Sequence, residues 1–229
     1  WGGKAAADLG LEGRVSAEDL RSVLDGKNPD PDGPALTASE NKASHQHGWD
    51  FTFAVPKSVT LLVLAAEKHD PALADRLKEH IMGANQAAMG YLEENHAITR
   101  VRDKEGGVRE VLTGNLLYGS VMHVTTRGGD PHIHVHNPIA NTTKNPETDQ
   151  YGALETRHMY RWIQNTSLVA ARALQDRLMS EGFSIERKGK LGWEVAGSSE
   201  KLVAEFSSRS QEIKAAAEGL EAERGVETT

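Results

Sequence analysis

The chain contains no cysteine among its 229 residues. Disulfide bonds, thiolate metal ligands and a cysteine nucleophile are therefore excluded. Long apolar stretches are also missing, because the longest run, from Val59 to Ala66, is far shorter than the roughly 20 residues that a membrane-spanning helix needs. No basic and apolar signal peptide opens the sequence. We expect a protein that inserts in no membrane and works in the reducing cytoplasm.

Basic residues are too few for a strongly cationic surface. The 26 Lys and Arg residues stand against 33 Asp and Glu residues, which gives a formal net charge of −7. A nucleic-acid partner usually requires a basic face, so only a local basic cluster could support DNA binding. The hydrophobic content of 38% is that of a globular protein, and the length favours one domain over two small ones.

Helical and strand-like patterns are mixed along the chain, which predicts the α+β class. Helices are expected over residues 16–25, 57–68, 71–95 and 155–181, with a last one that begins near Ser199. Strands are expected over residues 50–55, 97–102, 108–113, 115–125 and 132–137, and a short hairpin over 183–187 and 191–195. Ser16 is a suitable helix cap, and Gly182 is a suitable helix end. Residues 26–48 are rich in Pro, Gly and polar residues and predict a loop.

Three histidines, His132, His134 and His136, alternate along one expected strand, and His123 precedes the glycine-rich turn before that strand. Successive side chains of a strand point to opposite faces, so these three share a face. With the turn centred within the glycine pair 128–129, position 123 lies opposite position 134, where Cβ atoms are about 4.5–5.5 Å apart. We therefore expect the imidazoles of His123, His134 and His136 to meet at one ion.

Three neutral imidazoles leave coordination positions open, as in catalytic metal sites, whereas structural sites are closed by four ligands. The expected cofactor is one divalent metal ion: Zn, Mn, Ni, Cu and Fe suit imidazole, and Mg prefers more oxygen ligands. His132 faces the same side as the three ligands. Its role is open between a fourth ligand, a phosphate contact and an ordinary surface histidine.

At these residues the sequence resembles the MobF-type conjugative relaxases, a branch of the HUH endonucleases. The family's metal motif combines His, Arg, Asp-Pro, a His-x-His pair and a nearby Asn. Its counterparts here are His123, Arg127, Asp130-Pro131, His134, His136 and Asn141. A second stretch, Gly48 to Val59, is similar to the family's Asp-Leu-Thr-Phe-Ser-x-Pro-Lys-Ser pattern. The likeness extends from Gly2-Gly3 through the last expected helix.

The resemblance implies the relaxase fold, a central antiparallel β-sheet with helices packed on it. It also implies a site- and strand-specific nicking endonuclease that cuts single-stranded DNA at the origin of plasmid transfer. In that reaction a tyrosine attacks the phosphodiester and stays attached to the 5′ phosphate, while the metal ion polarises the scissile phosphate. The implied partners are origin DNA and the other relaxosome proteins of conjugation.

Some features depart from the family pattern. The family's nucleophilic tyrosines lie in an N-terminal motif ahead of the stretch that matches Trp1-Gly2-Gly3. The tyrosines present match no such motif: they are Tyr91, Tyr118, Tyr151 and Tyr160. We therefore expect a single relaxase domain over residues 1–229 that lacks the tyrosine segment and any C-terminal helicase, and that forms no DNA adduct alone. His132 replaces a common Gln, and Pro138 is expected to interrupt the strand or mark an edge.

Asp50 matches the family's acidic residue beside the metal. It could accept a hydrogen bond from a ligand histidine or take the tyrosine proton. Lys57 and Arg127 are candidate phosphate contacts, as are Arg187 and Lys188 in a basic hairpin tip. An ordinary solvated charge is the alternative for each of these residues.

Two other functions remain open on the sequence. One is a metal-dependent oxygenase or hydrolase that acts on a small molecule, because His-x-His pairs also occur in cupin barrels. That function predicts many short strands, whereas this sequence shows at least four long helical patterns. The other is a DNA-binding fragment without catalytic activity.

Overall fold

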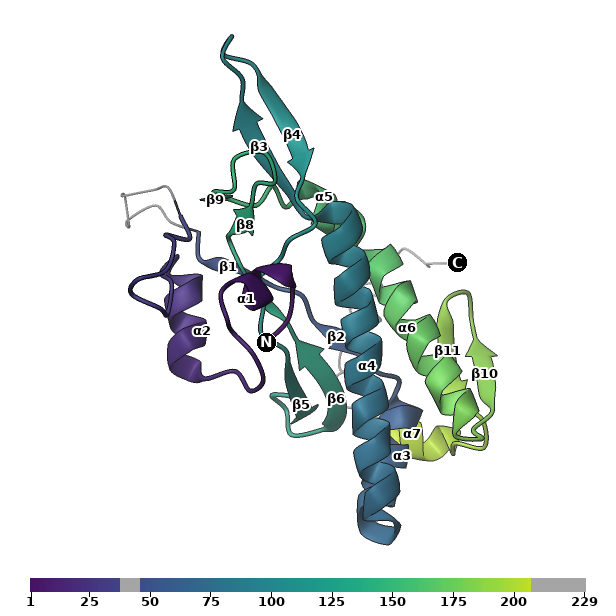
Figure 1. Cartoon of the computed structure of the whole chain (residues 1–229). Helices are drawn as coiled ribbons and strands as arrows, with labels where there is room; N and C mark the ends of the chain where they lie inside the picture. The colour runs from purple at the N-terminus through teal and green to yellow at the C-terminus, as the bar shows by residue number, and fades with distance from the viewer. Residues whose placement is uncertain (38–45, 207–229) are drawn as a thin grey trace, which may run out of the picture. The chain divides into compact units, whose positions relative to one another are not determined.

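The computed structural model describes residues 1–37 and 46–206 (Figure 1). The helices are α1 Lys4–Asp8, α2 Ala17–Leu24, α3 Lys57–His69, α4 Pro71–His96, α5 Arg157–Arg161, α6 Ile163–Ser180 and α7 Glu200–Glu205. The strands are β1 Gly48–Asp50, β2 Phe53–Ala54, β3 Ile98–Arg102, β4 Val108–Leu112, β5 Val121–Thr125, β6 Pro131–His136, β7 Pro138–Ala140, β8 Thr143–Lys144, β9 Tyr151–Gly152, β10 Ile185–Lys188 and β11 Gly192–Val195. Among these residues no helix is both long enough and apolar enough to cross a membrane.

The strands form small sheets in place of one continuous sheet. The ladders are β2-β6-β5, β1-β7, β3-β4, β8-β9 and β10-β11. The ladders β1-β7 and β2-β6 are formed by the same two chain segments. In one segment Phe51 lies between β1 and β2, and in the other Asn137 lies between β6 and β7. Phe51 N donates to Asn137 O at 3.1 Å and Asn137 N donates to Phe51 O at 3.2 Å, which joins the two ladders. This junction lies beside the histidine strand β6.

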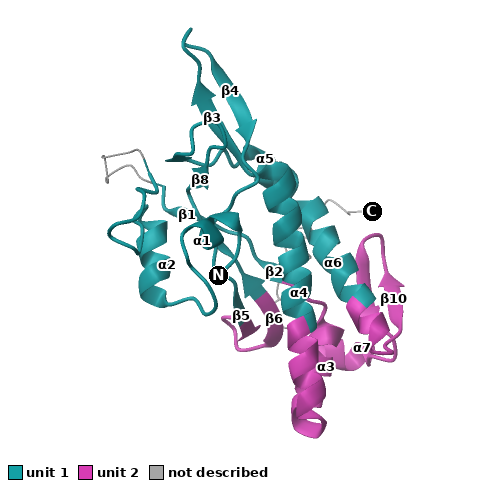
Figure 2. Ribbon diagram, in the orientation of Figure 1, with its two compact units in different colours: residues 1–53, 80–122, 135–176 teal, residues 54–79, 123–134, 177–229 magenta. Residues whose placement is uncertain are grey.

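The internal contacts divide the chain into two compact units, which alternate along the sequence (Figure 2). Unit 1 comprises residues 1–53, 80–122 and 135–176, and unit 2 comprises residues 54–79, 123–134 and 177–229. Neither unit is a continuous stretch of sequence. The expectation of a single domain over residues 1–229 therefore stays a prediction.

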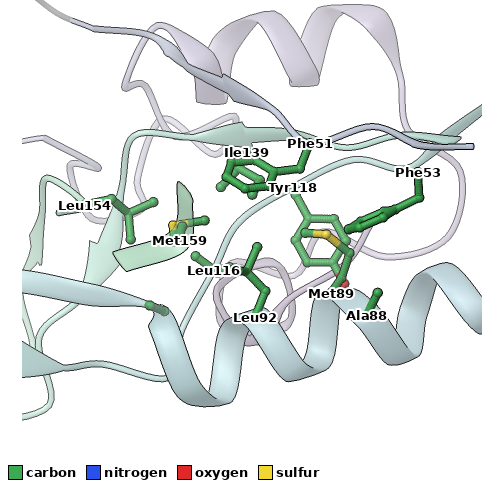
Figure 3. Close-up of a cluster of buried hydrophobic side chains, with 11 residues drawn as sticks. Phe51, Phe53, Ala88, Met89, Leu92, Leu116, Tyr118, Ile139, Leu154 and Met159 are labelled. Carbon is green, nitrogen blue, oxygen red and sulfur yellow. The ribbon is translucent and has the colours of Figure 1, made fainter. Parts of the chain in front are cut away.

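The core of unit 1 forms against helix α4. Its buried residues Ile81, Ala84, Ala88 and Leu92 recur every three or four positions, as the predicted apolar stripe requires. Figure 3 shows Leu92, Met89 and Ala88 of this helix facing a cluster of side chains from strands, from loop segments and from helix α5. That cluster contains Phe51, Phe53, Leu116, Tyr118, Ile139, Leu154 and Met159. Full burial stabilises the fold by about 1.5–3 kcal/mol for each large apolar side chain.

Unit 2 packs helix α3 against strand β11. Pro56 is the N-cap of this helix and offers no side-chain hydrogen bond to its first turn. Glu194 fills that role, because its Oε2 accepts from Ser58 N at 3.0 Å, while Ser58 Oγ accepts from Val195 N at 2.9 Å. Thr60 Oγ1 accepts from Ile133 N at 3.1 Å and so fixes β6 to the same helix.

Local signals predict most element ends correctly. Ser16 Oγ accepts from Asp19 N at 3.0 Å and caps α2. Gly182 ends α6 with a φ of 93°, a left-handed conformation that favours glycine. Pro138 stands at the first residue of β7, where its missing N–H is tolerated. Ser199 caps α7, and the rest of the predicted last helix lies outside the described residues.

Three predicted elements are wrong in extent. The strand over 50–55 is divided into β1 and β2, and the helix over 155–181 is divided at Trp162 into α5 and α6. Trp162 N lies within reach of both His158 O and Met159 O, a tightened turn that ends α5. In the strand predicted over 115–125, only β5 is present. Its first half makes isolated bridges from Tyr118 to Gly2 and Ile139, because the chain there passes between two different partners.

Candidate metal centre

The metal-motif histidines lie on the β5–β6 hairpin. At its turn, Gly129 N donates to Thr126 O at 3.0 Å and Thr126 N donates to Asp130 O at 2.9 Å. These bonds close a three-residue loop over residues 127–129, and the ring contact between His123 and His134 agrees with the predicted pairing of positions 123 and 134, which itself stays a prediction. Gly129 has a φ of 86°, which a residue with a Cβ rarely adopts, so it permits this three-residue loop.

The structure brings together the three histidines that the sequence singles out. His123, His134 and His136 each offer a ring nitrogen, and these three atoms all lie within 4.8 Å of one another. The rings of His123 and His134 meet edge to face, with centroids 5.5 Å apart and an interplanar angle of 81°. His123 is exposed and the other two are half-buried, so the group is open to solvent on one side.

The ring nitrogens of two of these histidines have defined roles. His134 Nδ1 donates to the carbonyl oxygen of His132 at 2.8 Å, and His136 Nδ1 donates to Asp50 Oδ2 at 2.5 Å. Each of these bonds places the proton on Nδ1 and leaves Nε2 with its lone pair. Fixing the tautomer of a histidine in this way is what metal sites commonly require of the surrounding residues.

Asp50 is held by residues on both sides of its carboxylate. Oδ1 accepts from Asn137 N at 3.1 Å, and Oδ2 accepts from Thr52 Oγ1 at 3.1 Å as well as from His136. The side chains of His136 and Asp50 are 32% and 44% exposed, so water weakens their attraction. The arrangement can orient His136, and it places a carboxylate beside the open side of the group.

His132 lies apart from the group of three. Its Nε2 donates to Val55 O at 3.1 Å, and its ring centroid is 6.1 Å from that of His134. Burial lowers the pKa of His132, and the nearby Lys57 charge lowers this pKa further. The described contacts thus favour a neutral histidine that anchors the hairpin.

The four candidate phosphate contacts have different surroundings. Lys57 Nζ donates to Pro131 O at 2.8 Å at the base of the hairpin, and burial lowers the pKa of this lysine. Arg127 is exposed in the turn of the same hairpin. Arg187 and Lys188 lie on β10, where Lys188 Nζ contacts Glu200 Oε1 at 2.8 Å and this contact raises the pKa of Lys188. DNA contact by these residues stays a prediction.

Burial separates the four tyrosines. Tyr118 is 6% exposed and Tyr151 is 8% exposed, and burial raises the pKa of Tyr118 to about 12. Tyr160 is 51% exposed and lies against Phe51, with ring centroids 5.3 Å apart. Tyr91 packs edge to face on the buried His96. A raised pKa disfavours the ionised hydroxyl, so Tyr118 is poorly suited to attack a phosphate.

The sequence reasoning missed two residues beside Asp50. Thr52 shares a strand face with Asp50 because it lies two positions later, so strand alternation could have found it. Asn137 follows His136, and alternation places it on the buried face with Ile133 and Val135. A polar residue at a core position signals a buried hydrogen-bond partner.

Comparison with known proteins identifies the family. All 229 residues match the family model described as TrwC relaxase. The multifunctional conjugation protein TraI of Escherichia coli is 32% identical over 228 residues, which cover 94% of this chain and 12% of TraI. TraI of Escherichia coli strain K12 is 30% identical over the same coverage. The chain therefore spans 12% of the length of these curated relatives.

Solved structures agree with the family match. Conjugative relaxase TrwC in complex with OriT DNA, free of metal, aligns with a TM-score of 0.85 and 27% identity over 99% of this chain and 75% of that one. Its metal-bound complex aligns with a TM-score of 0.84 and 27% identity over 99% of this chain and 74% of that one. These alignments confirm the predicted relaxase fold. Matched along its whole length by the family model and along nearly all of it by these structures, the chain belongs to the TrwC relaxase family.

Proposed function

We propose that this chain is the part of a conjugation protein that nicks one strand of DNA at a transfer origin. The observation that carries the proposal is the group formed by His123, His134 and His136, with Asp50 bonded to the Nδ1 of His136. Such a group can hold a metal ion against a phosphate while leaving coordination positions for the substrate. Family membership supports the DNA substrate.

The donor atoms fit a divalent transition metal. Three imidazoles with no thiolate suit Mn, Zn or Ni, and Mg fits less well because it prefers oxygen ligands. TrwC has been described in metal-bound and copper-bound complexes, which supports metal binding without deciding the ion. When bound, the ion supplies Lewis-acid polarisation of the scissile phosphate.

The protein side chains have distinct proposed roles around that ion. Asp50 holds the Nδ1 proton of His136 and so turns its Nε2 toward the metal position. The carbonyl of His132 does the same for His134. Lys57 and Arg127 on the hairpin, and Arg187 and Lys188 on β10, would contact backbone phosphates and position the strand.

The DNA partner is proposed from the relatives. TrwC complexes contain OriT DNA, and one contains a 27-mer with the recognition hairpin and the cleavage site. The net charge of −7 means that binding depends on local basic residues. We propose that residues 1–229 act as one domain, that the attacking tyrosine lies outside them, and that relaxosome proteins assist in the cytoplasm.

The small-molecule oxygenase or hydrolase is not favoured. A cupin-type site would lie inside a barrel of strands, whereas the histidine strands β5 and β6 belong to the three-stranded sheet β2-β6-β5. The described chain instead carries the 26-residue helix α4 and the 18-residue helix α6, and it aligns with DNA relaxases.

The first test is metal titration of the whole chain. Mn or Zn should saturate near one equivalent, and His134→Ala should abolish tight binding. His69→Ala, which changes an exposed histidine at the end of α3, serves as the matched control. Equal affinity of the parent and His134→Ala would remove the metal assignment.

The second test uses oligonucleotides that tile the transfer-origin region of the DNA molecule encoding this chain. Binding to one single strand should fall steeply with salt, because phosphate contacts release counterions. A covalent adduct on denaturing gels should require native residues ahead of Trp1. An adduct that the 229-residue chain forms alone, and that Tyr160→Phe or Tyr151→Phe removes, would show that the nucleophile is misassigned. Absence of oligonucleotide binding at low salt would contradict the DNA function.

A further inference from the structure

The residue after the last ligand histidine is buried completely. Asn137 is 0% exposed and shares the inward face of its strand with Ile133 and Val135, which are 0% and 1% exposed. An amide that loses water without gaining partners is costly. If packing alone mattered at this position, an apolar side chain of similar size would serve.

All hydrogen-bonding atoms of this amide are used. Asn137 Nδ2 donates to Phe51 O and to Asn85 Oδ1, both at 2.8 Å. Its Oδ1 accepts from Asn85 Nδ2 at 2.9 Å and from Ser120 Oγ at 2.6 Å. The pairing between Asn85 and Asn137 is reciprocal, and Asn85 Nδ2 also reaches Ser120 Oγ at 3.1 Å. Two donors and two acceptor positions exhaust what an Asn side chain offers.

The same residue also fixes the backbone of the metal site. Asn137 N lies 3.1 Å from Asp50 Oδ1 and 3.2 Å from Phe51 O, and Asn137 O accepts from Phe51 N at 3.1 Å. Its side-chain Nδ2 donates a further hydrogen bond to Phe51 O. Asn137 therefore joins the end of β6, which carries His136, to the segment that carries Asp50.

We propose that Asn85, Ser120 and Asn137 form an amide clamp, and that this clamp positions Asp50 and His136 for metal binding. The inference rests on the proposed metal site. Asn85 belongs to helix α4. The clamp therefore fixes the position of the C-terminal end of β6 relative to this helix. A metal site binds its ion more tightly when further hydrogen bonds hold its ligand side chains in one orientation.

The experiment compares metal affinity with thermal stability in the whole chain. Asn85→Ser and Asn137→Ser remove the reciprocal pair, and Ser120→Ala removes one hydroxyl donor with little disturbance. Asn115→Ser is the matched control, since Asn115 is 7% exposed and its amide bonds Lys144 N and Asp8 at a place that the metal motif does not include. Mn titration and melting temperature are measured for every variant.

The expected result is a Mn dissociation constant raised about tenfold in Asn85→Ser and Asn137→Ser, the low end for residues that orient ligands. Ser120→Ala should also raise the Mn dissociation constant, but by a smaller factor. Asn115→Ser should lower the melting temperature comparably while leaving the constant within about twofold of the parent, because its amide touches no residue of the motif.

Two outcomes would overturn the proposal in different ways. If the clamp variants lose stability like Asn115→Ser but keep the parent's Mn affinity, the amides are only structural and the metal site stands. If the parent itself shows no saturable Mn binding, the proposed metal site fails and the clamp fails with it. Should both Ser variants fail to fold, Ser120→Ala alone decides, and an unchanged constant rejects the clamp.

Discussion

Asp50→Ala isolates the contribution of the carboxylate that orients His136. The change removes the acceptor of the 2.5 Å bond from His136 Nδ1 and of the 3.1 Å bond from Thr52 Oγ1. Asn137 N keeps a second acceptor in Phe51 O at 3.2 Å, so no buried donor is left without a partner. The cost should therefore fall on metal binding more than on folding.

The size of the effect follows from the exposure of the pair. A hydrogen bond to a charged group contributes about 1.5–3 kcal/mol when it is well shielded. The side chains of His136 and Asp50 are 32% and 44% exposed, so we expect a contribution at the lower end of this energy range. Since about 1.4 kcal/mol is a factor of ten, the metal dissociation constant should rise roughly tenfold.

Competition titration against a chromophoric chelator measures this constant. Asp25→Ala is the matched control, because Asp25 Oδ1 lies 3.2 Å from His47 Nδ1 in an exposed pair outside the metal motif. Equal affinity in Asp50→Ala and the parent would refute the orienting role. A loss as complete as that of His134→Ala would instead make Asp50 a ligand.

Four further predictions concern stability. Gly3→Ala should lower the unfolding free energy by roughly 1–3 kcal/mol, because φ is 89° and a Cβ would lie 2.0 Å from a carbonyl oxygen. Gly10→Ala, with φ of 68° and nothing within 4 Å, should cost only about 1–2 kcal/mol in urea unfolding. Glu194→Ala should lower the unfolding free energy by about 1 kcal/mol, because Ser58 N at the start of α3 loses its acceptor, with metal affinity unchanged in titration. Burial raises the pKa of Tyr118 from its usual 10.0 to about 12 in the folded protein, so its contribution to the unfolding free energy is present below pH 10 and is lost as pH rises toward 12. The difference in urea stability between the parent and Tyr118→Phe should shrink across that range, and a constant difference would contradict the burial of its hydroxyl.

The sequence predicts the histidine group well because the signal is local. Alternation along one strand assigns His134 and His136 to one face, and a tight turn returns the chain past His123. Helix α4 is equally predictable, since its apolar residues repeat at helical spacing over 26 residues. The fold itself was expected from the family resemblance, and the alignment with TrwC confirms it.

Side-chain pairs between distant segments could not be predicted in the same way. Asn85 and Asn137 meet only because α4 packs beside the end of β6. No local sequence pattern in either segment predicts this contact. The bridges of Tyr118 to Gly2 and Ile139 likewise depend on tertiary partners, which override the propensity of the segment.

Helix α4 also fixes the distance between two attachment points inside unit 1. Asn85 holds the strand end that carries His136, and Glu93 Oε1 accepts from Lys4 N and Leu116 N, both at 2.7 Å. At 1.5 Å per residue these two attachment points are about 12 Å apart along a helix that stretches very little. The first residues of the chain and the strand end that carries His136 are thus attached to one helix at two points whose separation the helical backbone keeps constant.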